Sequence, residues 1–79
     1  MPGHRVQALY AFLAIDPDDD EAVPAFHDAQ TGYFMPLVGS DLVRVESLRE
    51  MAQRIATRSG HRITLVKFTT REDVEVLEP

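Results

Sequence analysis

The clearest pattern of apolar and polar positions is a ten-residue apolar run near the start of the chain. Residues 6–15 read VQALYAFLAI, with apolar side chains in both alternating sets, and the run stops at Asp16 and Pro17. Such a run, ended by a turn signal, is typical of a strand that is buried on both faces. A helix is the alternative, because Ala and Leu are frequent, but the short length and the Asp-Pro end favour a strand.

Two shorter apolar segments follow, and each contains a proline. They are 22–27, AVPAFH, and 33–37, YFMPL, and the five residues DAQTG between them suit a hairpin loop that ends at Gly32. Pro24 and Pro36 each lack the N–H that would donate to a neighbouring strand. We therefore expect two strands that lie at an edge of the sheet or carry a bulge.

The spacing of apolar residues changes to a helical one after residue 47. Ser47 and Glu50 in SLRE form a capping-box pattern, and Gly60 suits a left-handed cap at the helix C-terminus. Between them, apolar residues recur with the spacing of a single helical stripe, and these residues are Leu48, Met51, Ala52, Ile55 and Ala56. The pattern predicts one amphipathic helix that starts at Ser47.

Two more segments complete the predicted elements. Residues 62–68, RITLVKF, read as a strand, and the alternation in 73–77, DVEVL, allows a short extra strand. The order β-β-β-α-β predicts an α+β fold: a mainly antiparallel sheet of four to five strands with one amphipathic helix on one face. We expect a single domain over 1–79, with the strands at 6–15 and 62–68 in the centre of the sheet.

This layout leaves one face of the predicted sheet without a helix. The uncovered face would expose an apolar patch drawn from Tyr10, Phe12, Val66 and Phe68. Contiguous exposed apolar patches usually mark interfaces, and closed two-fold dimers are the commonest soluble oligomers. We therefore predict an interface at this face and a homodimer. The alternative is that loops and the C-terminal segment fold over the patch.

The charge of the chain is concentrated in its first half. The formal net charge is −5, and residues 1–40 hold six acidic residues against Arg5. Residues 41–79 hold seven acidic and seven basic residues. A net negative charge disfavours binding to phosphates, so the composition argues against nucleic acid as a class of partner. No segment has the length of apolar sequence that spans a membrane.

Cysteine is absent from the sequence. This excludes disulfides, thiolate metal sites and thiol nucleophiles, and it fits a cytoplasmic protein. A domain of this size rarely gains more than about 3–5 kcal/mol from its core, so self-association is one remaining source of stability.

Five acidic residues follow the first strand, and we call them the acidic turn: Asp16, Asp18, Asp19, Asp20 and Glu21. Their spacing matches the opening of an EF-hand calcium loop, but the sixth position of the motif is Glu21 where Gly is required. The twelfth position is His27 where the motif has Glu. The sequence therefore predicts a turn that joins two strands and biases the charge of an approaching partner, with no metal site.

Catalytic motifs are missing as well. The three histidines lack zinc-ligand spacing, and no nucleophile elbow or phosphate-binding glycine loop occurs. We expect a non-enzymatic protein without a cofactor. Two alternatives remain: a nucleic-acid-associated protein that stacks bases on Tyr10, Phe12, Tyr33 or Phe34, and a small metal-dependent hydrolase that uses Asp18, Asp20 and His27.

The chain also bears a resemblance to known sequences. Two stretches resemble small uncharacterised α+β proteins from bacteria and their phages. They are YAFLAIDPDDDEAVPAF and, after it, MPLVGSDLVRVESLREMAQRIATRSGHRITLVKFTTREDVEVLEP. The resemblance covers most of the chain and brings no known activity. It implies a compact standalone domain, so we predict a small interaction protein, such as an accessory protein of the phage type.

Overall fold

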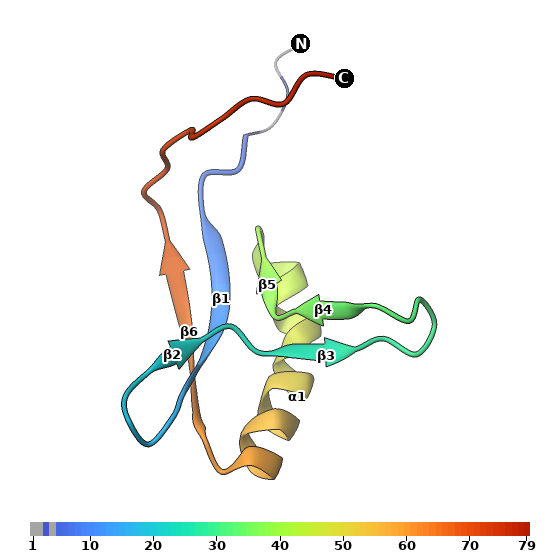
Figure 1. Cartoon of the computed structure of the whole chain (residues 1–79), viewed down its shortest axis with the longest axis vertical. Helices are drawn as coiled ribbons and strands as arrows, with labels where there is room; N and C mark the ends of the chain where they lie inside the picture. The colour runs from blue at the N-terminus through green and yellow to red at the C-terminus, as the bar shows by residue number, and fades with distance from the viewer. Residues whose placement is uncertain (1–2, 4) are drawn as a thin grey trace.

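The structure is a computed structural model, and it describes residue 3 and residues 5–79. It has the predicted α+β architecture, with antiparallel strands and one helix (Figure 1). The elements are β1 (Leu9–Ile15), β2 (Glu21–Ala22), β3 (Ala25–His27), β4 (Phe34–Pro36), β5 (Val38–Gly39), α1 (Leu42–Ser59) and β6 (Arg62–Phe68).

The main sheet is built around β1. Strand β6 pairs with β1 antiparallel over all seven residues, from Leu9 opposite Phe68 to Ile15 opposite Arg62. The other edge of β1 is shared by β2 at one end and β5 at the other. Both β5 and β6 are antiparallel to β1, so they run parallel to each other, and α1 connects them. β1 is central as predicted, but β6 is not: in the described part of the chain it lies at an edge.

The predicted strand at 22–27 is divided at Pro24 into β2 and β3, whereas the predicted strand at 33–37 forms only β4, and β5 follows it outside the predicted bounds. β3 and β4 form a separate two-stranded hairpin that projects sideways from the body (Figure 1). β2 and β5 join the main sheet. Leu37 connects the two sheets, because its N–H donates to the Pro24 carbonyl (3.1 Å) and its carbonyl accepts from the Phe12 N–H (3.0 Å). Pro24 lies between β2 and β3, and Pro36 is the last residue of β4, so each proline lies next to the point where the chain changes sheets.

The helix starts earlier than its sequence pattern predicts. Asp41 is the N-cap residue, and its Oδ1 accepts from the Arg44 N–H at 2.8 Å. The prediction of a cap at Ser47 is therefore wrong: its hydroxyl lies inside the helix and donates to the Arg44 carbonyl at 2.6 Å. An aspartate at this position accepts a hydrogen bond from a backbone N–H that has no partner within the helix. Its negative charge also interacts favourably with the positive end of the helix dipole. The C-terminal cap at Gly60 (φ 73°) is confirmed.

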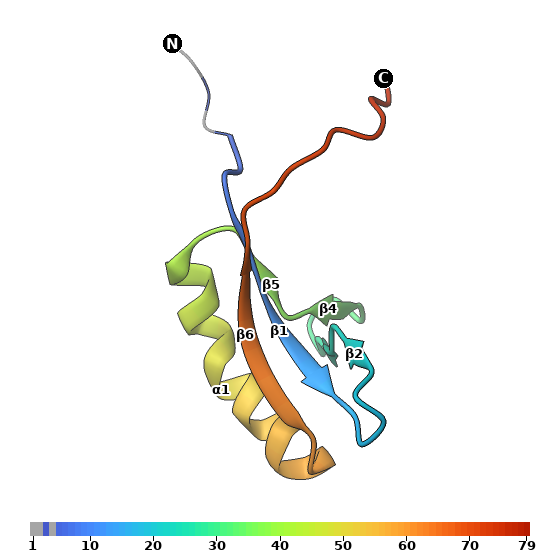
Figure 2. The same cartoon turned by 90° about the vertical axis from the view of Figure 1, so that its left-hand side faces the viewer.

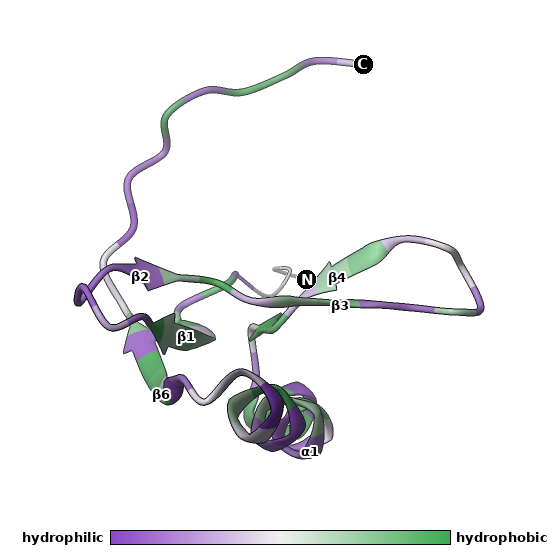
Figure 3. Ribbon diagram, turned by 60° about the horizontal axis from the view of Figure 1, so that its bottom comes forward, coloured by the Kyte–Doolittle hydropathy of each residue, from purple (hydrophilic) through white to green (hydrophobic). Residues whose placement is uncertain are grey.

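The core lies between the helix and one face of the main sheet (Figure 3). Its buried members are Phe12, Leu37, Val45, Leu48 and Ala52. Half-buried side chains pack against them from the sheet, the hairpin and the helix, namely Tyr10, Phe26, Met51, Ile55 and Ile63. The predicted helical stripe thus supplies the core, together with Val45 from the turn of helix that the sequence pattern left out.

The chain leaves the body at both ends on the same side of the molecule (Figure 2). Residues 69–79, which we call the C-terminal tail, continue from the end of β6 without returning to the sheet (Figures 1 and 2). The extra strand predicted at 73–77 is not formed in the described part of the chain, where β6 is the last element. Among the described residues, no helix is long and apolar enough to cross a membrane.

Candidate functional site

The pairing register of β1 and β6 decides which side chains share a face. Residues directly opposite each other in an antiparallel pair point to the same side of the sheet. Phe12 is opposite Leu65, and Phe12 belongs to the core, so this set faces the helix. Tyr10 is opposite Lys67 on the same face, and the Lys67 ammonium lies 5.9 Å from the centre of the Tyr10 ring. The alternate set faces away from the helix, and we call it the outer face: Leu9, Ala11, Leu13, Ile15, Arg62, Thr64, Val66 and Phe68.

The four residues predicted to form one apolar patch lie on two different faces. Phe12 is only 5% exposed, in the core, and Tyr10 is half-buried on the same helix-facing side. Val66 is half-buried and Phe68 is 48% exposed, both on the outer face. The grouping of these four is therefore wrong, because strand alternation alone gives no register between β1 and β6. The interface role remains a prediction for Val66 and Phe68.

Apolar exposure on the outer face is concentrated at one end of the sheet. Ala11 and Leu13 are buried in the middle of the face, whereas Leu9 and its partner Phe68 are both exposed. An open hollow of about 360 Å³ lies beside this pair, lined by residues 6–9 and 68–72. The exposed end of the outer face is thus a concave, largely apolar surface at the base of the two terminal segments.

A second feature lies next to this surface. The outer edge of β6 has no strand beside it in the described part of the chain, and we call it the open edge. It offers unpaired backbone N–H and C=O groups over seven residues, and no proline or bulge interrupts it. The sequence signal for an edge position was present in Arg62 and Lys67 near the two ends of this strand, since charged residues are common on edge strands.

The acidic turn is a turn, as predicted. Asp16 organises it, because its Oδ1 accepts from the N–H groups of Asp18 (2.8 Å) and Asp20 (3.0 Å). Backbone bonds between Asp16 and both Asp19 and Asp20 close the loop, with Asp19 in the left-handed region at φ 65°. Among residues 3 and 5–79, no three His, Asp or Glu side chains gather where they could hold a metal ion. The Asp16 carboxylate therefore shapes the backbone of the turn, and the other four acidic residues are exposed to solvent.

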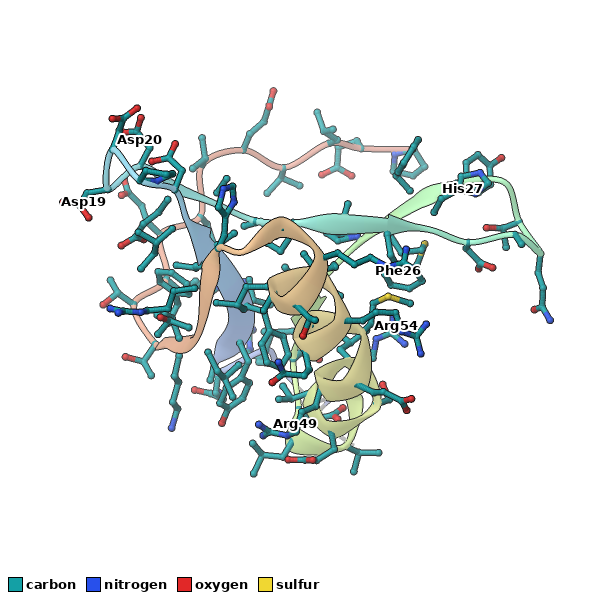
Figure 4. The ribbon with its side chains drawn as sticks, turned by 90° about the horizontal axis from the view of Figure 1, so that it is seen from below. Asp19, Asp20, Phe26, His27, Arg49 and Arg54 are labelled. Atoms are coloured by element: carbon teal, nitrogen blue, oxygen red, sulfur yellow. The ribbon has the colours of Figure 1, made fainter. Side chains whose placement is uncertain are left out.

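The residues of the hydrolase alternative are far apart. Figure 4 shows Asp19 and Asp20 of the acidic turn at one end of the molecule and His27 on the hairpin at the other. The His27 ring packs edge-on against Phe34, with centroids 5.3 Å apart. The described residues thus do not bring Asp18 and Asp20 together with His27 in one site.

The aromatic residues considered for base stacking are also divided. Phe12 and Tyr10 are taken up by the core and its margin, while Tyr33 and Phe34 are strongly exposed on the hairpin. These two aromatics form a separate exposed surface, on the element that projects furthest sideways (Figure 1).

The charges of the helix are largely paired with one another. Arg49 bonds Glu46 at 2.9 Å, and Arg54 bonds Glu50 at 3.4 Å. The hydrogen bonds from Arg49 and its positive charge lower the pKa of the Glu46 carboxyl. The same hydrogen bonds and the negative charge of Glu46 raise the pKa of the Arg49 guanidinium. The helix therefore does not present a continuous basic stripe of the kind that binds a phosphate backbone.

No protein-family model matches the chain, and no curated protein or solved structure matches it significantly. Two adjoining features are the best candidates for function: the exposed end of the outer face and the open edge of β6. Sequence reasoning found Phe68 and Val66 but missed Leu9, because the pairing of Leu9 with Phe68 depends on the register.

Proposed function

We propose that this chain is a small non-enzymatic interaction protein that forms a homodimer through the exposed end of its outer face. The observation that carries the proposal is the exposed pair of Leu9 and Phe68 beside an open apolar hollow. Removing apolar surface of this kind from water is favourable, and closed two-fold dimers are the commonest soluble oligomers.

The wider setting of the proposal follows from composition and resemblance. A chain without cysteine suits the cytoplasm, and the resemblance to small bacterial and phage proteins suits an accessory role. The acidic turn keeps a cluster of negative charge exposed, away from the Leu9–Phe68 end of β1. In this proposal it keeps the dimer soluble and favours a basic surface on any further protein partner.

Light scattering coupled to size-exclusion chromatography tests the dimer over a range of concentrations. Phe68→Ser is expected to raise the dimer dissociation constant by at least about tenfold, because a large apolar contact is lost. Phe34→Ser is the matched control: Phe34 is also exposed, at 72%, but lies on the hairpin. A wild-type chain that stays monomeric at every concentration would rule the proposal out, and so would equal effects of the two variants.

A second candidate function is nucleic-acid association through the hairpin. The observation that favours it is the strong exposure of Tyr33 and Phe34, since exposed aromatic rings can stack with unpaired bases. Salt-sensitive binding of a single-stranded oligonucleotide, abolished by Phe34→Ser and unaffected by Phe68→Ser, would select this candidate over the homodimer. The absence of binding at low salt would eliminate it.

A further inference from the structure

We propose that the C-terminal tail of one copy adds as a strand to the open edge of β6 in a second copy, reciprocally. This inference rests on the homodimer of the proposed function and specifies how the two copies exchange segments. Its first support is the open edge itself, a seven-residue strand whose outer backbone N–H and C=O groups are unpaired and which carries several apolar side chains. Such an edge is a template for another strand, and natural proteins usually cover or interrupt it.

The tail has the sequence of a strand but no partner strand in the described part of its own chain. Val74, Val76 and Leu77 are 91%, 76% and 82% exposed, and apolar and polar residues alternate from 73 to 76 (Figure 3). Valine is among the residues most enriched in strands, and an exposed alternating segment has little reason to stay apolar unless it is covered. The tail therefore has the properties of a strand that pairs outside its own chain.

The charges of the two segments are complementary. β6 carries Arg62 and Lys67 and no acidic residue. Residues 72–79 carry four acidic residues and no basic one, namely Glu72, Asp73, Glu75 and Glu78. Opposite charges across a strand pair are stabilising, and complementary charge selects one partner over others.

A second copy fits this edge better than the tail of the same chain. The tail leaves the body in continuation of β6 (Figures 1 and 2), and residues 69–72, TTRE, contain none of the Gly, Asn or Pro residues that favour tight hairpins. Two chains related by a two-fold axis need no turn at all. Residues 65–77 of each chain then run straight along the same residues of the other, antiparallel.

Two-fold symmetry also restricts the register, because one residue must face its own copy at the axis. With Arg71 at the axis, apolar residues face apolar residues and Lys67 faces an acid; the pairs are Phe68–Val74, Val66–Val76, Leu65–Leu77 and Lys67–Glu75. Arg71 bonds Asp73 of its own chain at 2.8 Å, which offsets the repulsion between the two guanidinium groups. In this register Val74 of the second copy covers the exposed ring of Phe68.

Cysteine cross-linking tests the register, because the chain has no cysteine of its own. We expect the double variant Val66→Cys/Val76→Cys, or the neighbouring pair Leu65→Cys/Leu77→Cys, to form a disulfide-linked dimer on mild oxidation. The two pairs are adjacent along the strands, so one of them is a non-hydrogen-bonded pair of the antiparallel ladder. In such a pair the Cβ atoms of the two opposite residues lie close enough for a disulfide. Val66→Cys/Leu77→Cys is the control, since its two positions lie on opposite faces in this register.

The outcome of cross-linking separates the possibilities. A monomer with an internal disulfide would show that the tail folds onto its own β6, which overturns exchange between copies. No disulfide in either pair, or equal linking in the control, would also overturn it. A chain that scatters light as a dimer but does not cross-link would leave the proposed function standing and remove the tail exchange alone.

A charge swap provides a second measurement in the intact chain. Glu75→Lys and Lys67→Glu each place like charges opposite each other twice in the dimer, and we expect each to raise the dissociation constant roughly fivefold to tenfold. The combination of both changes should restore the wild-type value at low salt. Single variants without effect, or a double variant weaker than either single, would contradict the pairing of these two residues.

Discussion

The two long strands of this protein have the same length and pair residue for residue, yet their surroundings differ. β1 has neighbours on both edges, contains no charged residue, and is buried at residues 11–13. β6 has a neighbour on one edge in the described part of the chain, and none of its residues is buried. Both strands are apolar on both faces, so this pattern alone does not place a strand at the centre of a sheet. The charged residues within β6 are what distinguish them.

The largest test of this difference compares the phenylalanines of the two strands. Phe12→Ala removes a buried ring from the core and should lower the free energy of unfolding by about 3–5 kcal/mol, close to the whole stability of a domain this small. Phe68→Ala, measured by urea unfolding at the same low concentration, should cost about 1 kcal/mol or less, because the ring is half exposed.

A milder variant keeps this comparison measurable if Phe12→Ala does not fold. Phe12→Leu retains most of the apolar volume and should cost about 1 kcal/mol, with a cooperative transition. Equal losses for Phe12→Ala and Phe68→Ala would show that β6 is as deeply packed as β1, and the contrast between the strands would fail.

The second test concerns the edge of β1 that pairs with β2 and β5. Gly39 pairs with Tyr10, and a Cβ added there would lie 2.7 Å from Cγ and 3.1 Å from Cβ of Arg44. Gly39→Ala should therefore destabilise the fold by about 1–3 kcal/mol through overpacking. The double variant Gly39→Ala/Arg44→Ala should recover part of this loss in thermal unfolding, because it removes the closer atom. No recovery would mean that the close approach is not the cause.

The third test concerns the helix that covers β1 and leaves the outer face of β6 free. Asp41→Ala removes the side chain that caps the helix and should cost about 1 kcal/mol. Ser47→Ala should be nearly neutral, because Ser47 lies inside the helix. The reverse ranking in denaturant titrations would place the helix start at Ser47, as the capping-box pattern predicted.

Some of these features were readable from the sequence because they are local. The bounds of β6 at 62–68, the glycine cap at Gly60 and the turn at Asp16 each depend on residues within a few positions, and the structure has all three. The prediction of a turn at the acidic residues is confirmed. It could be made from the sequence because Glu21 and His27 depart from the calcium motif, and a carboxylate that bonds nearby backbone N–H groups explains the pattern instead.

The features that sequence reasoning missed depend on contacts between distant segments. The edge position of β6 and the division of Tyr10 and Phe12 from Val66 and Phe68 follow from a register that no local pattern gives. The helix starts at Leu42 because Asp41 caps it and Val45 is buried in the core. The capping-box pattern at Ser47 lies further along the same helix. A one-residue change of strand pairing exchanges the two faces, so site residues on a sheet need the register first.

The smallest test concerns the turn that joins β1 to its neighbour β2. Asp16→Ala removes the acceptor for two backbone N–H groups in an exposed turn and should cost about 0.5–1 kcal/mol. Asp16→Asn keeps an oxygen in the same place and should stay close to the wild type. Millimolar calcium should leave the melting temperature of all three proteins unchanged, since the carboxylates of the acidic turn do not gather as metal ligands. A calcium-dependent rise in the melting temperature of the wild type that both Asp16→Asn and Asp16→Ala lack would instead assign a metal ion to the turn. The pairing of β1 with β2 would then depend on that ion.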